Sequence, residues 1–153
     1  MVGIMKWRLL LSSVGLLFLA LTCSAQTITF RVITDQGKPL EKRKVSISLE
    51  GFKNGEPIGH GQIQETDKSG EAKFTLPSPP PDHFFFEVEI GSPYWHCGCA
   101  GIPRTEEVTQ KGIVRSAASK DSTSAFIAQP GEVLVVARQF SLIERLLYPL
   151  MKD

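Results

Sequence analysis

Apolar and polar residues alternate along four stretches of the chain. In the first stretch Ile28, Phe30 and Val32 are apolar and the residues between them are polar. A period of two residues is typical of a β-strand that faces a core on one side and solvent on the other. The pattern therefore predicts strands at 27–32, 44–49, 71–76 and 84–90. The expected inward-facing residues of the last three are Val45, Ile47 and Leu49; Ala72, Phe74 and Leu76; and Phe84, Phe86, Val88 and Ile90.

A fifth run, 133–137, is apolar throughout and predicts a central strand. Shorter candidate strands are 62–65, 106–109 and 125–129. The segments between strands are rich in residues that favour turns, as at Asp67–Gly70 and Pro130–Gly131. The proline-rich stretch 77–81 lacks the N–H groups that a sheet needs and is expected to be a loop. Seven or eight short strands at this spacing predict an antiparallel β-sandwich over 26–139.

The last segment, 140–153, has helical rather than strand periodicity. Ser141 and Glu144 have the spacing of a capping box, which predicts a helix over 142–148 that ends before Pro149. A helix this short is marginal alone, so its apolar side needs a partner surface. Two hypotheses remain: the helix packs across an open edge or end of the sandwich, or it docks onto a partner or a membrane surface. The apolar residues concerned are Leu142, Ile143, Leu146, Leu147 and Leu150.

The first 25 residues differ from the rest of the chain. Lys6 and Arg8 precede a short apolar run, and small residues lead up to Gln26. This layout predicts a secretory signal peptide over 1–25 that is cut between Ala25 and Gln26. The alternatives are a retained membrane anchor, for which the apolar run is short, and a lipoprotein acylated at Cys23. We expect an exported, periplasmic or extracellular protein.

The charge of the mature chain is nearly balanced. Removing Lys6 and Arg8 with the leader leaves 15 of the 17 basic residues against 16 acidic ones, a net of −1 with histidines neutral. A balanced surface argues against nucleic acid as a partner, and against an anionic membrane bound by charge alone.

Three segments of the chain resemble the carboxypeptidase regulatory-like domain. They are Val32–Leu40 with its Asp-x-Gly-x-Pro turn, Val45–Ile47, and Thr66–Phe74 with its Thr-Asp-x-x-Gly turn. The resemblance covers about 27–90, and 91–123 has no counterpart in it. It implies a seven- to eight-stranded, Ig-like or transthyretin-like β-sandwich found in exported bacterial proteins. It also implies a module that stabilises, presents or binds rather than catalyses.

The most distinctive stretch for chemistry contains His96, Cys97 and Cys99. After the leader is removed Cys97 and Cys99 are the only two cysteines, and an oxidising compartment favours a disulfide between them. Free thiols or an intermolecular bridge are a second possibility. A metal site is a third, because two thiolates and an imidazole are soft ligands that suit copper(I) or zinc. His60 and His83 have no spacing that recruits them as further ligands.

Tyr94 and Trp95 lie beside this stretch and form either a binding face or a cover over the sandwich rim. The motifs of serine hydrolases, zinc proteases and phosphate-binding loops do not occur in the sequence. We therefore expect no enzyme activity and no cofactor. The leading hypothesis is an exported module with a binding or structural role at the cell envelope. The alternatives are metal or thiol handling through Cys97 and Cys99, and an accessory subunit that docks through its C-terminal helix.

Overall fold

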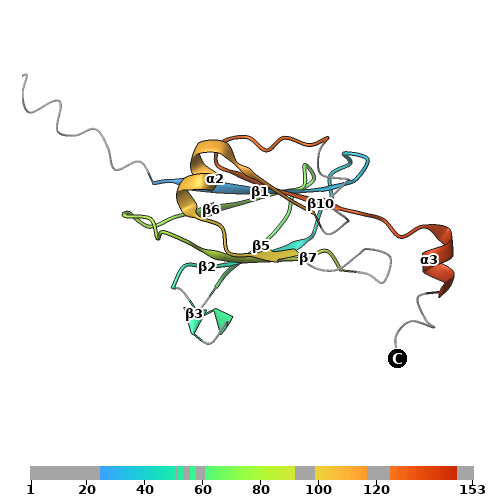
Figure 1. The fold of residues 1–153 in the computed structure, drawn as a ribbon, viewed down its shortest axis with the longest axis horizontal. Helices are drawn as coiled ribbons and strands as arrows, with labels where there is room; N and C mark the ends of the chain where they lie inside the picture. The colour runs from blue at the N-terminus through green and yellow to red at the C-terminus, as the bar shows by residue number, and fades with distance from the viewer. Residues whose placement is uncertain are drawn as a thin grey trace, which may run out of the picture.

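The computed structural model describes residues 25–50, 52–53, 56–57, 61–91, 99–116 and 125–147. These residues form two four-stranded sheets that are stacked as two layers, together with a two-stranded hairpin and two short helices (Figure 1). The predicted β-sandwich with a short C-terminal helix is confirmed. The strands are β1 (Thr27–Thr34), β2 (Lys44–Ser48), β3 (Phe52–Lys53), β4 (Glu56–Pro57), β5 (Gln62–Glu65), β6 (Glu71–Thr75), β7 (Phe85–Glu89), β8 (Cys99–Gly101), β9 (Ile113–Ser116) and β10 (Glu132–Ala137). The helices are α2 (Thr105–Lys111) and α3 (Leu142–Leu147).

The first sheet has the order β6-β1-β10-β9, and the second has the order β5-β2-β7-β8. All pairs in the second sheet are antiparallel. In the first sheet β1 is antiparallel to β6 but parallel to β10, and β10 is parallel to β9. The prediction that the strands are antiparallel throughout is therefore wrong for these two pairs, because the alternation of polarity along a strand does not specify the direction of its neighbours.

The inner faces of both sheets consist of the residues that the alternation predicts. Ile28, Phe30 and Val32 of β1 are wholly buried. The same holds for the inward-facing Phe74 of β6 and for Phe86 and Val88 of β7. The Phe30 ring lies at the centre of an aromatic cluster. Its centroid is 5.5 Å from that of Phe74 and 5.3 Å from that of Phe86. Such tilted and edge-on pairs add to the burial energy of the rings.

Strand β10 is buried on both faces, as its apolar sequence predicts. The outer face is covered by segment 125–129, whose Phe126 and Ala128 pack against Leu134 and Val136. The prediction of a strand at 125–129 is wrong. This segment belongs to the connection that returns the chain from β9 to the parallel strand β10, and such a crossover lies over a sheet rather than in it.

The prediction of a strand at 106–109 is also wrong, because these residues lie in helix α2. Glu106 and Glu107 occupy its first turn, Lys111 its last, and Gly112 ends it at a φ of 71°. Acidic residues near the start, a basic residue near the end and a terminal glycine are typical helix signals. Only one side of α2 faces the core, where Val108 is wholly buried.

The predicted turn at 67–70 is confirmed and is held by one carboxylate. Asp67 Oδ1 accepts hydrogen bonds from the N–H groups of Ser69 and Glu71 and from Ser69 Oγ, and these bonds lower the pKa of Asp67. Gly70 follows with a φ of 78°, and a Cβ atom there would lie 2.5 Å from the carbonyl oxygen of Val32. Glycine is therefore required at this position for its conformation and for the close approach of β1.

Candidate functional site

Helix α3 begins with the capping box that the sequence predicts. Glu144 Oε2 accepts a hydrogen bond from the Ser141 N–H at 2.7 Å, and Ser141 Oγ accepts one from the Glu144 N–H at 3.3 Å. These two bonds satisfy main-chain donors that a helix start leaves unpaired. Local sequence thus determines where this helix begins.

A second contact ties α3 to the end of β10. Arg138, the residue after β10, donates two hydrogen bonds to Glu144, at 2.6 Å from Nη2 and 3.2 Å from Nη1. Paired N–H donors that face a carboxylate fix orientation as well as distance. The Arg138 guanidinium, with help from Ser141, lowers the pKa of Glu144 to about 2. These polar contacts at the first turn, which we call the α3 clamp, tie the start of the helix to the end of β10.

The apolar side of α3 faces solvent. Leu142 is 72% exposed, Ile143 68%, Leu146 70% and Leu147 46%, and none of the helix residues is buried. At about 100° per residue these four side chains occupy one side of the helix, and Glu144 and Arg145 lie outside that arc. We call these four residues the α3 apolar face. The hypothesis that the helix packs across an edge or end of the sandwich is thus wrong for the described residues, and α3 lies beyond the end of the two layers (Figure 1).

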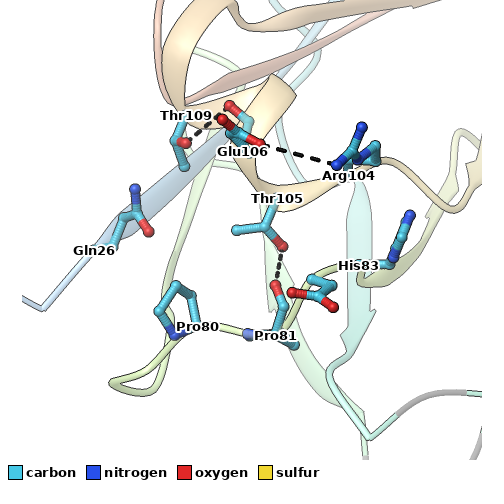
Figure 2. A pocket seen from close by; sticks show the side chains of 9 residues that line it. Gln26, Pro80, Pro81, His83, Arg104, Thr105, Glu106 and Thr109 are labelled. Atoms are coloured by element: carbon cyan, nitrogen blue, oxygen red, sulfur yellow. Dashed lines mark hydrogen bonds and ion pairs between the residues drawn. The ribbon is translucent and has the colours of Figure 1, made fainter.

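A cavity of about 360 Å³ with a mixed polar and apolar lining, which we call the end cavity, lies at one end of the sandwich. It is formed where the end of the proline-rich loop meets the start of α2, and Gln26 lies across from His83 and Arg104 (Figure 2). An isolated antiparallel β-bridge between His83 and Arg104 joins the loop to the start of α2. The residues that line the cavity are Gln26, Pro80, Pro81, Asp82, His83, Arg104, Thr105, Glu106 and Thr109.

The hydrogen bonds around this cavity fix main-chain segments. Thr105 Oγ1 donates to the Pro81 carbonyl at 2.5 Å, and the Thr105 N–H donates to the Asp82 carbonyl at 2.8 Å. Thr109 Oγ1 donates to the Glu106 carbonyl within the helix. Arg104 and Glu106 form an ion pair at 4.0 Å that is mostly exposed and therefore weak. These contacts explain how the loop and α2 stay together, and they give no sign of an activated nucleophile.

Sequence reasoning misses this cavity for two reasons. The pattern of the proline loop indicates a connection without a site, and the pattern of 106–109 indicates a strand. The helix signals at Glu106, Glu107, Lys111 and Gly112 could have placed a helix start beside the loop. The contact between the proline-rich loop and the start of α2 depends on the pairing of 82–84 with 103–105, which no local pattern indicates.

Cys99 is the member of the predicted metal or disulfide set that falls within the described residues. It lies in β8, is 7% exposed and belongs to the main hydrophobic core. Burial raises the pKa of its thiol, and the positive charge of Arg115 acts in the opposite direction. A raised pKa disfavours the thiolate, which is the form that binds metals and exchanges disulfides. In the described part of the chain, His, Cys, Asp and Glu form no group of three or more that is placed to hold a metal ion.

The other predicted site residues lie outside the described residues. The disulfide or metal hypothesis at Cys97, Cys99 and His96 therefore remains a prediction. The same holds for the cleavage signal over 1–25 and for acylation of Cys23. Within the described residues, neither helix has the length and apolar character to cross a membrane. The other candidates that lie outside the described residues are Tyr94 and Trp95 of the expected binding face, and His60, Tyr148 and Leu150.

No family model matches this chain, and the search of curated proteins finds no match either. Solved structures with a similar arrangement include the full-length major pilin SpaD of Corynebacterium diphtheriae, at 13% identity and a TM-score of 0.43. Another is 3-chlorocatechol 1,2-dioxygenase of Rhodococcus opacus 1CP, at 13% identity and a TM-score of 0.37. The matches cover 75% and 76% of this chain but only 30% of the pilin and 60% of the dioxygenase. Likenesses this distant say nothing about the chemistry or the partners of this chain.

Proposed function

We propose that this chain is an exported, non-enzymatic β-sandwich module that binds a partner protein at the cell envelope through the α3 apolar face. The observation that carries the proposal is the exposure of four large aliphatic side chains on a helix whose start is capped by Ser141 and paired with Arg138. Contiguous exposed apolar surface on an otherwise well-packed domain is typical of an interaction site. Burying one such side chain contributes about 1.5–3 kcal/mol, so the four favour docking against the free-energy cost of association.

The partner is best described as a protein with an apolar groove. A helix of six residues presents much less than the roughly 800 Å² per partner of an ordinary interface, so a flat surface would cover too little of it. A groove surrounds the helix and buries more of each side chain, which is a common mode of helix recognition. Tyr94 and Trp95 are candidates for additional contacts.

A membrane surface fits less well than a protein groove. Helices that lie in a membrane interface carry many lysines and arginines on their polar side. In α3 the polar residues are Glu144 and Arg145, and Glu144 is already paired with Arg138. The mature chain also has a net charge near zero. The start of β1 and helix α3 lie at opposite ends of the two layers (Figure 1). A chain attached to a membrane near its start would therefore present α3 away from that membrane.

Export is supported by the position of the expected cut relative to the fold. Cleavage before Gln26 leaves the whole of β1, which begins at Thr27. A cut even three residues later would remove Ile28, which is wholly buried. As part of the proposal we place the module among the carboxypeptidase regulatory-like domains. The positive φ angles of Gly37 and Gly70, in the two turns that carry the resemblance, support this assignment.

The proposal is tested by co-purification from a bacterial host that exports the chain. The full-length protein is compared with a Leu142→Ser/Leu146→Ser variant and with an Ile63→Ser control, in which an exposed isoleucine of β5 is changed instead. We expect one envelope protein to co-purify with the natural chain and the control at equal yield, and to be lost from the α3 variant. Equal recovery with all three chains would contradict docking through α3. Retention of all three in the cytoplasm would contradict export.

A further inference from the structure

The end cavity contains the residue that becomes the first of the mature chain. If the leader is cut before Gln26, the α-amino group of Gln26 is released at the edge of this cavity. The Gln26 side chain lines the cavity together with Pro80, Pro81 and Thr109 (Figure 2). A glutamine at a free amino terminus carries an amine and a carboxamide that are separated by the distance needed to close a five-membered ring.

We propose that Gln26 is a modification site at which the mature amino terminus cyclises to pyroglutamate. In this step the α-nitrogen attacks Cδ of the same residue, an N–Cδ bond forms, and the Cδ–Nε2 bond breaks. The amide nitrogen leaves as ammonia after taking up a proton from the amine, so the reaction needs no oxidant or other reactant. The proposal rests on the proposed export, because the amine exists only after the leader is removed.

The fold leaves space for ring closure at Gln26 and fixes the main chain from the Gln26 carbonyl onward. The Gln26 carbonyl accepts a hydrogen bond from the Leu76 N–H at 2.8 Å, and Thr27 is already paired with Thr75 in the sheet. Ring closure turns only bonds of Gln26 that precede this fixed carbonyl. The side chain is half-buried beside a cavity of about 360 Å³, which is ample for a lactam ring.

The product differs from the open chain in two ways that matter outside the cytoplasm. The lactam nitrogen carries no charge, so the positive charge of the amino terminus is lost. A pyroglutamate also has no free amine for an aminopeptidase to recognise. Because β1 starts at the next residue, trimming by two or three residues would reach Ile28 in the core. Cyclisation thus protects the first strand of the sandwich.

The test is an intact mass of the mature protein taken from its exporting host, with an amine-blocking reagent added at lysis. We expect a chain that starts at Gln26, is lighter than the open form by one ammonia, and is not labelled at its amino terminus. Gln26→Asn is the matched control, since its side chain is one methylene too short for the ring. That variant should show the open-chain mass and a labelled terminus.

Two results overturn the proposal, and they are distinguishable. A chain that starts at Gln26 with the open-chain mass and a labelled amine contradicts cyclisation but leaves the proposed export intact. A chain that still carries 1–25, or that starts at an acylated Cys23, contradicts cyclisation together with the predicted cut.

Discussion

The inner faces of the sheets and the outer side of α3 have similar apolar sequences and opposite environments. Ile28, Phe30 and Val32 of β1 are wholly buried, whereas Leu142 and Leu146 of α3 are about 70% exposed. The strands bury their apolar residues against each other, so packing within the chain explains the apolar positions of the strands. Packing among the described residues does not explain the α3 apolar face, because that face is exposed. The difference shows that the sandwich buries its core without α3, and it supports our proposal that α3 makes contacts with a partner.

The first prediction has the largest expected effect and concerns a substitution in the buried core. Phe30→Ala should lower the free energy of unfolding by about 3–5 kcal/mol, because it opens a cavity between the rings of Phe74, Phe84 and Phe86. Chemical denaturation monitored by fluorescence measures the change. Phe30→Leu keeps most of the volume and should cost distinctly less. Equal losses for the two variants would contradict a tightly packed core.

The second prediction compares two glycines with nearly the same φ. Gly37→Ala should cost about 1–2 kcal/mol for its left-handed conformation alone, since nothing lies within 4 Å of the added Cβ. Gly70→Ala has the same conformational cost and, in addition, places Cβ against the carbonyl of Val32. Its free energy of unfolding should therefore fall further than that of Gly37→Ala. Equal destabilisation of the two variants would show that the approach of the turn to β1 is not tight.

The third prediction concerns the clamp of α3 and its dependence on pH. The pKa of Glu144 is about 2 in the folded chain, against 4.5 for a glutamate without these partners. A depressed folded pKa means that the carboxylate stabilises the helix fully above about pH 4.5, and that this contribution is lost as the pH falls towards 2. Amide signals of 142–147 followed by NMR should lose their helical shifts in this window while those of β1 stay unchanged. Glu144→Gln should remove the transition, and a transition that persists in this variant would contradict the clamp.

The fourth prediction has the smallest expected effect on stability. Leu142→Ser/Leu146→Ser should change the free energy of unfolding by only about 0.5 kcal/mol, because surface substitutions away from packed sites cost little. Chemical denaturation in parallel with Phe30→Ala gives the comparison on one scale. A loss of several kcal/mol would mean that the α3 apolar face packs inside this chain.

Most of the fold could be predicted from the sequence because burial on one side of a strand leaves a period of two residues. β1, β2, β6 and β7 follow such runs, and β10, which is buried on both faces, follows a run that is apolar throughout. The two wrong strand predictions have different causes. In α2 only Thr105 and Val108 are buried, so a single short segment carries too little periodicity to tell helix from strand. Segment 125–129 alternates because Phe126 and Ala128 lie on the sheet, although it has no ladder partner.

The candidate sites were less accessible to sequence reasoning than the fold. The capping box predicts where α3 begins, because Ser141 and Glu144 interact locally. Whether its apolar side is covered depends on where the helix lies relative to the sheets, which the local capping pattern does not determine. The end cavity depends on Gln26, the proline loop and α2 meeting in space. Local patterns carry no information about such meetings.

The most direct test of the central proposal is site-specific photo-crosslinking in the exporting host. A photoreactive residue replaces Leu146 in one chain and Ile63 in another, so that both positions are exposed and apolar but only one lies on α3. The account predicts a single discrete crosslinked product between the Leu146 position and another envelope protein, and none from the Ile63 position. Crosslinks from position 146 that lie only within this chain, or equal products from both positions, would contradict it.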